Sequence, residues 1–303
     1  MKNALNYFYN LNSFDIHQVD GIYKFNINDN LYCFLEYTRD IREIKEIYNL
    51  SLELLHKGVY CHQIIPNKNG EFITYVNQKP YVLLQVYIDM DKKISLEDIE
   101  FFSNSTSLFE YNEILKRNNW NVLWESKIDY FEYQMSQLGK KYHLIRDSFN
   151  YYIGLVENGI SLFNSIKIDY KYYSVQHRRI KYNDTLFDLY NPLNFVIDLK
   201  IRDISEYFKE QFIYYDNVFN DIKEYLIRNN LSTYECLMFF IRMLYPSFYF
   251  DLYEEIIEER KQEKNLLNII DKTNNYQLLL KNIYLFLNNY IPVPEIEWLK
   301  KHK

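Results

Sequence analysis

The sequence predicts an α+β fold with two lobes, a small lobe of strands and one helix followed by a larger, mostly helical lobe. Before residue 88, apolar residues recur with a period of two in short runs, and one helical pattern lies among these runs. Near residue 95 the period changes to 3.6 and keeps that value through most of the remaining chain. We therefore expect a small lobe over residues 1–88 and a helical lobe over residues 89–303.

Local signals define the elements of the small lobe. Its expected strands cover residues 22–27, 31–37, 72–76 and 81–87. Asn28-Asp29-Asn30 and Asn77-Gln78-Lys79 separate the members of each strand pair, as residues of hairpin turns do. Residues 39–57 carry apolar side chains at helical spacing, and Gly58 suits the end of this helix.

The large lobe follows a predicted linker over residues 88–95, which contains Asp89, Asp91, Lys92 and Lys93. Three helical stripes of apolar side chains come after it, and packed core faces explain all three. The stripes consist of Trp124, Ile128, Phe131, Met135 and Leu138; of Phe149, Tyr152, Val156, Ile160 and Phe163; and of Tyr276, Leu280, Ile283 and Leu287.

Composition argues against several classes of protein. The net charge of -6 gives no global field for nucleic acid. Only 6 residues are glycine, where average usage would give about 21, and no GxGxxG or Walker pattern is present. Cys33, Cys61 and Cys236 lack zinc-site spacing and fit a reducing compartment. No apolar run suits a membrane span or a signal peptide, so we expect a cytoplasmic protein.

Residues 173–208 carry most of the side chains that could do chemistry. Their candidate residues are His177, Arg178, Arg179, Asn183, Asp184, Asp198 and Arg202. The apolar run Phe195-Val196-Ile197 reads as a buried strand that delivers the carboxylate of Asp198 to its exit. A helix is expected to begin near Arg202. A histidine loop, an aspartate at a strand end and a helix thus follow one another within one supersecondary unit.

This order resembles the catalytic segment of the aminoglycoside-phosphotransferase type of kinase-like fold, most closely its spore-coat-associated branch. In that family a His-Gly-Asp motif carries the catalytic aspartate, an asparagine metal ligand follows, and a second metal aspartate ends an apolar strand. His177 matches the motif histidine, Asn183 or Asp184 falls at the asparagine, and Asp198 matches the metal aspartate. The phrases NNWNVLWESKIDYFEYQ, RMLYPSFYFD and IPVPEIEWLK extend the resemblance over nearly the whole chain. The resemblance implies a kinase-like two-lobe fold.

Two positions depart from the family pattern. Arg179 stands where the catalytic aspartate belongs, and Leu35 stands where a strand lysine would bind the nucleotide phosphates. An arginine is always protonated and cannot act as a base, and losing a general base typically costs about 10²–10⁴ in rate. The resemblance also implies that adenine would contact the backbone of Gln85 to Tyr87. Because both the lysine and the aspartate are replaced, we expect no cofactor, or only weak binding of ATP with magnesium.

Several candidate residues have a structural alternative. Lys24 is either a substitute phosphate lysine or a solvated strand lysine, and His177 is either a proton carrier or a histidine that fixes the loop. Asp198 either holds a metal with Asn183 or Asp184 or forms an ion pair with a nearby arginine, and we hypothesise that this arginine is Arg179.

The basic cluster of Arg178, Arg179 and Lys181 also has two interpretations. It either receives an anion, for which the planar fork of arginine is suited, or pairs with the aspartates of the segment. Those aspartates are Asp184, Asp188, Asp198 and Asp203.

Three functional hypotheses follow. The first is a degenerate kinase-like protein, a pseudokinase of spore-coat type with a binding or structural role. The second is an active phosphotransferase on a small hydroxylated substrate, with Asp198 as metal ligand and Asp184 or Asp188 as base. The third is an anion-binding module built on Arg178 and Arg179. The resemblance implies a spore-coat or other protein partner, whereas nucleic acid and membrane are not expected, and the oligomeric state stays open.

Overall fold

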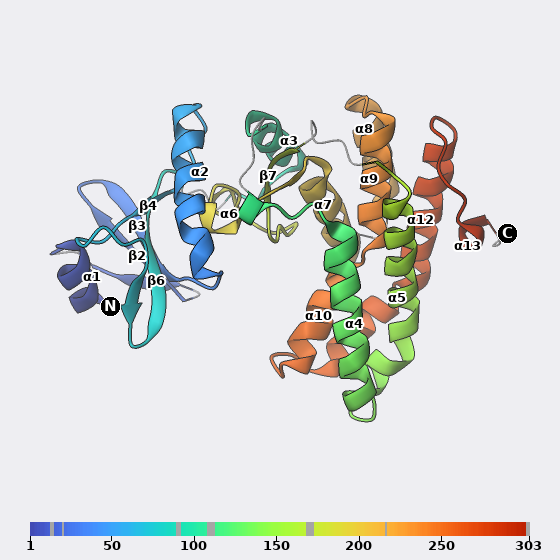
Figure 1. Cartoon of the computed structure of the whole chain (residues 1–303), viewed down its shortest axis with the longest axis horizontal. Coiled ribbons are helices and arrows are strands. Elements are labelled where there is room, and N and C mark those ends of the chain that lie inside the picture. The colour runs from blue at the N-terminus through green and yellow to red at the C-terminus, as the bar shows by residue number, and fades with distance from the viewer. Residues whose placement is uncertain are drawn as a thin grey trace. The chain divides into compact units, whose positions relative to one another are not determined.

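A six-stranded antiparallel sheet organises the N-terminal part of the computed structural model (Figure 1). Its strand order is β1-β2-β3-β6-β4, with β5 paired to the same β6. The strands are β1 (His17–Val19), β2 (Ile22–Ile27), β3 (Asn30–Glu36), β4 (Gln63–Ile65), β5 (Thr74–Val76) and β6 (Lys79–Val86). The structure describes residues 1–12, 15–19, 21–88, 92–107, 113–167, 173–215 and 217–300. Asp89 and Asp91 of the predicted linker lie outside these ranges.

Tight turns set the register of two hairpins. Asn28 and Asp29 have φ values of 48° and 63°, and Ile27 pairs with Asn30 across them. A second turn follows the same plan over residues 77 and 78, with Val76 opposite Lys79. Two consecutive residues with positive φ match the right-handed twist of the flanking strands. Both predicted turns are therefore confirmed.

Two helices pack on the sheet. α1 (Lys2–Tyr9) buries Leu5 in a cluster with Phe25, Phe34, Tyr81 and Leu83. α2 (Ile44–His56) follows a 3-10 turn at Ile41–Glu43 and packs beside β4. At its end, Gly58 has a φ of 84°, and the Val59 amide donates to Leu54 O at 2.9 Å. This left-handed residue closes the helix, as the sequence predicts.

A second, two-stranded sheet carries the histidine loop, which begins at His177 and links the two strands. β7 (Tyr173–His177) pairs with β8 (Phe195–Leu199), and every residue of both strands is buried. α3 (Leu96–Ser105) packs on β7, where Ser103 Oγ lies 3.0 Å from Ser174 Oγ. The short α6 (Leu186–Leu189) lies between the two strands in sequence.

The chain forms two compact units whose boundary differs from the predicted division at residue 88. The first unit combines residues 1–116 with residues 173–198, and the second combines residues 117–172 with residues 199–303. The hairpin of β7 and β8 belongs to the first unit because it packs on α3 and on the segment around Lys116, which bridges to Ile197. The histidine loop and the six-stranded sheet therefore lie within one unit.

The second unit is helical. Its longer helices are α4 (Trp120–Leu138), α5 (His143–Asn164), α7 (Ile201–Tyr214), α8 (Phe219–Arg228), α9 (Thr233–Leu244), α10 (Ser247–Ile257) and α12 (Thr273–Asn288). The short α11 (Leu267–Ile270) and α13 (Glu297–Lys300) complete it. α9 packs against α5, α7 and α12. The three predicted stripes lie on α4, α5 and α12 and are buried, except that Met135 and Leu138 are half-buried.

A buried ion-pair network joins three of these helices. Glu206 of α7 accepts hydrogen bonds from Lys209 Nζ at 2.8 Å, Arg242 Nε at 2.7 Å and Ser247 Oγ at 2.5 Å. Lys209 Nζ also donates to the carbonyls of Arg242 and Tyr245. Burial alone would raise the pKa of Glu206, but Lys209 and Arg242 outweigh it and hold that pKa well below its usual range. Glu206 is therefore ionised and fully partnered.

Three aromatic rings lie close to Arg242 of this network. The guanidinium carbon of Arg242 lies 4.9 Å from the ring centroid of Trp120, 5.6 Å from that of Trp124 and 5.9 Å from that of Tyr245. The flat guanidinium of arginine suits such stacking. The network therefore ties α4 to α7 and α9 inside the second unit.

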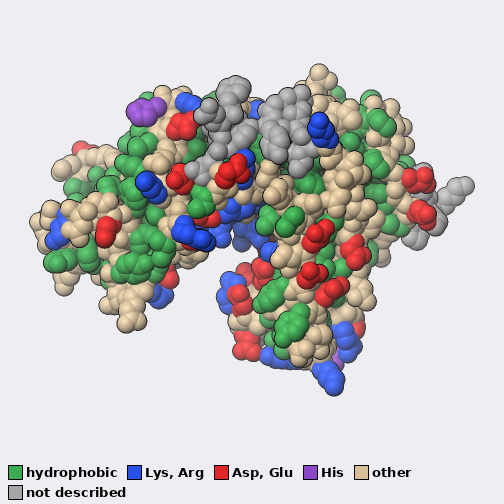
Figure 2. Space-filling view, in the orientation of Figure 1, with side chains coloured by type: hydrophobic (Ala, Val, Ile, Leu, Met, Phe, Trp, Pro, Cys, Tyr) green, Lys and Arg blue, Asp and Glu red, His purple; other side chains and the backbone are tan. Residues whose placement is uncertain are grey.

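The surface carries both signs of charge. Basic and acidic side chains are interspersed on the face drawn in Figure 2. Cys33, Cys61 and Cys236 are buried as thiols, with no disulfide between them. Among the helices that the structure describes, none is both long and apolar enough to cross a membrane.

Candidate functional site

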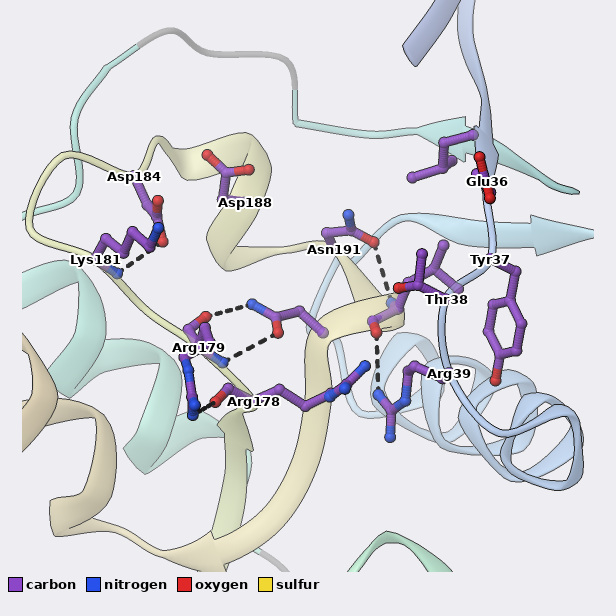
Figure 3. Close-up of a pocket in the computed structure, with 13 residues that line it drawn as sticks. Glu36, Tyr37, Thr38, Arg39, Arg178, Arg179, Lys181, Asp184, Asp188 and Asn191 are labelled. Carbon is purple, nitrogen blue, oxygen red and sulfur yellow. Dashed lines mark hydrogen bonds between the residues drawn. The ribbon is translucent and has the colours of Figure 1, made fainter. Parts of the chain in front are cut away.

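A pocket of about 340 Å³ lies between the end of β3 and the loop that links β7 to β8 (Figure 3). All of its lining residues belong to the first unit. They are Leu35, Glu36, Tyr37, Thr38, Arg39, Arg178, Arg179, Lys181, Asp184, Asp188, Asn191, Leu193 and Asn194. The two positions that depart from the family pattern, Leu35 and Arg179, thus line one pocket and leave it open.

His177 fixes the start of the histidine loop through buried contacts. Its side chain is buried, and its Nε2 bonds to Leu189 O at 2.8 Å. The ring also packs against Phe102 and Phe195, with centroids 5.2 and 5.4 Å away. His177 is not among the residues that line the pocket. These contacts favour the structural alternative for this histidine.

Asn194 holds the arginines of the loop in place. Its side chain donates to Arg179 O at 2.6 Å and accepts from the Arg179 amide at 3.3 Å, while its backbone carbonyl accepts from the Arg178 amide at 2.8 Å. The Arg179 side chain is exposed, and its Nη1 donates to Arg178 O at 3.1 Å. Asp198, by contrast, is completely buried in β8. The pairing of Arg179 with Asp198 stays a prediction.

Two aspartates stand at the opposite side of the pocket from Arg39. Asp188 caps α6, because its Oδ2 accepts from both the amide and the hydroxyl of Thr185 at 2.9 Å. Asp184 Oδ2 accepts from the Lys181 amide at 2.8 Å. Burial raises the pKa of Asp184 to about 6, and the nearby Asp188 carboxylate acts in the same direction. Asp184 therefore changes charge close to neutral pH.

Arg39 is a pocket residue that the sequence did not single out. Its Nε donates to Glu43 Oε2 at 2.6 Å, and its Nη1 donates to Phe195 O at 2.7 Å and Leu193 O at 3.0 Å. Only 1% of its side chain is exposed. One arginine therefore ties the segment before α2 to the first residue of β8, Phe195, 156 residues away in sequence.

The remaining predicted site residues lie outside the pocket lining. The exposed Asn183 accepts from Lys93 Nζ at 2.8 Å, and Asp198 is completely buried. Gln85 donates from its side chain to Asn30 Oδ1 at 3.2 Å, and the ring of Tyr87 is exposed. The structure thus brings Leu35, Arg178, Arg179, Lys181, Asp184 and Asp188 to one pocket, whereas the lining does not include His177, Asn183, Asp198, Gln85 or Tyr87.

One of the predicted metal ligands, Asn183, is engaged by another side chain, and the metal site of Asp198 with Asn183 or Asp184 stays a prediction. The amide oxygen of Asn183 already accepts from an ammonium group, which a metal ion would have to displace. Over the described residues, no group of three or more His, Cys, Asp or Glu side chains could hold a metal. Hard cations such as Mg²⁺ need oxygen ligands brought to one point.

His62 and Lys24 are two further residues of interest. His62 Nδ1 accepts from the Tyr87 amide at 3.4 Å, and its Nε2 donates to Phe187 O at 3.1 Å, an assignment that follows from these partners. The Tyr87 amide belongs to the segment where the resemblance places adenine. Lys24 is half-buried, with its Nζ 4.8 Å from the ring centroid of Phe187, so it is not a simply solvated lysine.

A family model described as spore coat putative kinase YutH matches residues 2–283. The chain belongs to this family. Its relative in Bacillus subtilis (strain 168), the endospore coat-associated protein YutH, is 25% identical over 292 residues, which cover 86% of each chain. The resemblance to the spore-coat branch is confirmed.

Solved structures show that this YutH-family chain has the aminoglycoside-phosphotransferase type of kinase-like fold. An aminoglycoside phosphotransferase from Alicyclobacillus acidocaldarius has a TM-score of 0.66 at 9% identity, with 95% of this chain and 97% of that chain covered. AMP-bound spectinomycin phosphotransferase has a TM-score of 0.59 at 11% identity, with 93% and 96% covered. The predicted α+β, two-lobe kinase-like fold is confirmed.

Proposed function

We propose that this YutH-family chain is a kinase-like protein with a binding role that transfers no phosphate, and that it acts at the spore coat. The observation that carries the proposal is the pocket shared by Leu35 and Arg179. These are the positions where the family pattern has a phosphate-binding lysine and a catalytic aspartate. Phosphoryl transfer depends on positioning and on charge neutralisation around the transferred group. Leu35 has no charge to offer the phosphates, and Arg179, which is always protonated, cannot take the role of the catalytic aspartate.

Contacts outside the pocket also support a non-catalytic role. Lys93 occupies the side-chain oxygen of Asn183, one of the two residues at which a metal ligand is expected. The Tyr87 amide, where adenine is expected to contact the backbone, donates to His62 instead. A nucleotide would have to break both contacts to bind in the usual way. The name of the Bacillus subtilis relative supports the placement at the endospore coat.

Phosphotransfer is tested by ADP formation. The full chain is incubated with ATP and Mg²⁺ or Mn²⁺ between pH 6 and 8, and ADP is followed by chromatography. We expect no ADP above the protein-free control. ADP formation by the parent chain that Asp184→Asn abolishes and Asp147→Asn leaves intact would overturn the proposal. Asp147 is a suitable control because it is an exposed carboxylate on α5, in the other unit.

One observation favours a second candidate, an active phosphotransferase that uses Asp184 as its base. A general base works best when its pKa lies near the operating pH, and burial raises the pKa of Asp184 to about 6. Perturbed carboxylates in pockets are also common at functional sites. This candidate predicts ADP formation that rises with pH around an apparent pKa near 6, whereas the first candidate predicts none at any pH.

A further inference from the structure

The outward side of α4, in the second unit, carries four large apolar side chains that are open to solvent. Val122, Leu123, Tyr130 and Tyr133 are each between 44% and 66% exposed. At 3.6 residues per turn, all four fall within a sector of about 100° around the helix axis. Single exposed apolar residues are ordinary on a protein surface, but a stripe of them along one helix is typical of a surface that binds a partner.

A row of acidic side chains borders this stripe. Glu125, Asp129 and Glu132 are exposed and follow one another at spacings of four and three residues, so they line one edge of α4. Within the described chain, none of the three carboxylates has a hydrogen bond or an ion pair. Figure 2 shows acidic side chains gathered over the helix that Figure 1 labels α4. We call the apolar stripe and this acidic row together the α4 face.

The opposite side of α4 is packed into the core, so the α4 face is held in place. The residues buried on that side are Trp120, Trp124, Ile128 and Phe131. The ring of Phe131 stacks on that of Phe250 with centroids 5.2 Å apart, and α4 packs along α5. A surface fixed in advance loses less entropy when a partner binds.

Charge argues against two of the candidate occupants. A symmetric contact between two copies uses the same patch on both, and it would set the acidic row of one copy against either the acidic row or the apolar stripe of the other. The first arrangement brings like charges together, and the second buries carboxylates without partners. A membrane surface with anionic lipids is repelled by the same row. Both halves of the α4 face therefore favour a positively charged protein segment with apolar side chains.

We propose that the α4 face binds a basic amphipathic segment of a partner protein, with Lys or Arg side chains beside an apolar stripe. The cations of such a segment pair with Glu125, Asp129 and Glu132, and its apolar side chains cover Tyr130 and Tyr133. Tyrosine is enriched in the cores of protein interfaces, and a cation over its ring adds attraction. The inference goes beyond the proposed function, because the α4 face lies outside the unit that holds the pocket.

Fluorescence anisotropy with the full chain tests the proposal. The probes are a small panel of labelled amphipathic peptides of Leu and Lys, each long enough to span the roughly 28 Å of α4, and matched peptides in which Glu replaces Lys. We expect saturable binding of at least one Lys peptide and of no Glu peptide. Raising NaCl from about 0.1 to 1 M should weaken the binding, because the Debye length falls from about 10 to 3 Å. No saturation by any Lys peptide, or equal binding of a Glu peptide, would overturn the proposal.

Two pairs of variants locate the binding surface. Tyr133→Ser should weaken binding of the Lys peptide by about 10–100-fold, the loss that truncating a central interface tyrosine causes. Tyr290→Ser is its control and should have little effect, because Tyr290 is 71% exposed but lies beyond α12. Glu132→Lys should weaken binding by about tenfold or more, whereas Glu224→Lys, at an exposed position of α8, changes the net charge equally and should have little effect. Equal affinities in all four variants would place the peptide elsewhere and refute the assignment.

The parent and Tyr133→Ser also decide between occupants. Their self-association is compared by sedimentation equilibrium, and their membrane binding by flotation with phosphatidylglycerol vesicles. We expect the two chains to behave alike in both experiments. Self-association or vesicle binding that Tyr133→Ser removes would assign the α4 face to a second copy or to a membrane and overturn the proposal. None of these results depends on ADP formation, so failure of this inference and failure of the non-catalytic role are distinguishable.

Discussion

The buried network around Glu206 provides the sharpest test of how the second unit is held together. Glu206→Gln keeps the shape of the side chain and removes its charge. Lys209 and Arg242, whose side chains are 0% and 5% exposed, would then lose the carboxylate that they share. Breaking a buried ion pair from one side costs about 3–5 kcal/mol. At about 2–4 °C per kcal/mol, the melting temperature should fall by roughly 6–20 °C.

Thermal unfolding followed by circular dichroism measures this fall. The control is Glu254→Gln, which removes the partner of Lys127 at 2.9 Å in a pair whose side chains are more than one-third exposed. Exposed pairs contribute about 0–1 kcal/mol, so the control should melt close to the parent. Combining Glu206→Gln with Lys209→Met should cost less than the sum of the two single variants, since both act on one network. If Glu206→Gln melts like Glu254→Gln, the network does not stabilise the unit as described.

Two further predictions concern the histidine loop. The pKa of Asp184 is raised in the folded state, so its contribution to stability is present below about pH 4 and is lost as the pH rises through about 6. Asp184→Asn should therefore stabilise the chain at pH 8 by about 1–3 kcal/mol and leave it unchanged at pH 4; equal urea midpoints at pH 8 would contradict this. His177→Ala should cost about 1–3 kcal/mol because it leaves Leu189 O without its buried donor, whereas His177→Gln should cost less. A parent-like midpoint for His177→Ala would show that the ring does not fix the loop.

Features set by neighbouring residues were predictable from the sequence. The turn at Asn28-Asp29, the bounds of β2 and the end of α2 at Gly58 all follow from local backbone preferences. The apolar stripes of α4, α5 and α12 were equally clear because a packed helix repeats its buried face. α1, β1 and β4 were missed. The two strands have three residues each, too few for a readable alternation.

The site was predictable only in part, because its geometry depends on contacts distant in sequence. Arg39 meets Phe195 across 156 residues, and His62 meets Phe187 across 125. No local pattern signals either contact. The raised pKa of Asp184 comes from burial, which the isolated sequence NDT does not reveal. Arg179 could be identified as a site residue because a sequence motif places it. The hydrogen bond from Lys93 to Asn183, 90 residues away, has no such signal in the sequence.

Magnesium dependence of nucleotide binding tests the central claim most directly. Thermal melting of the full chain is measured with millimolar ATP, in Mg²⁺ and in EDTA. A ligand at 100 times its dissociation constant stabilises a fold by about 2.7 kcal/mol, which is readily visible. The non-catalytic account predicts that Mg²⁺ adds no stabilisation to that seen with ATP in EDTA. A clear rise in melting temperature that requires Mg²⁺ and disappears in Asp198→Asn would contradict it.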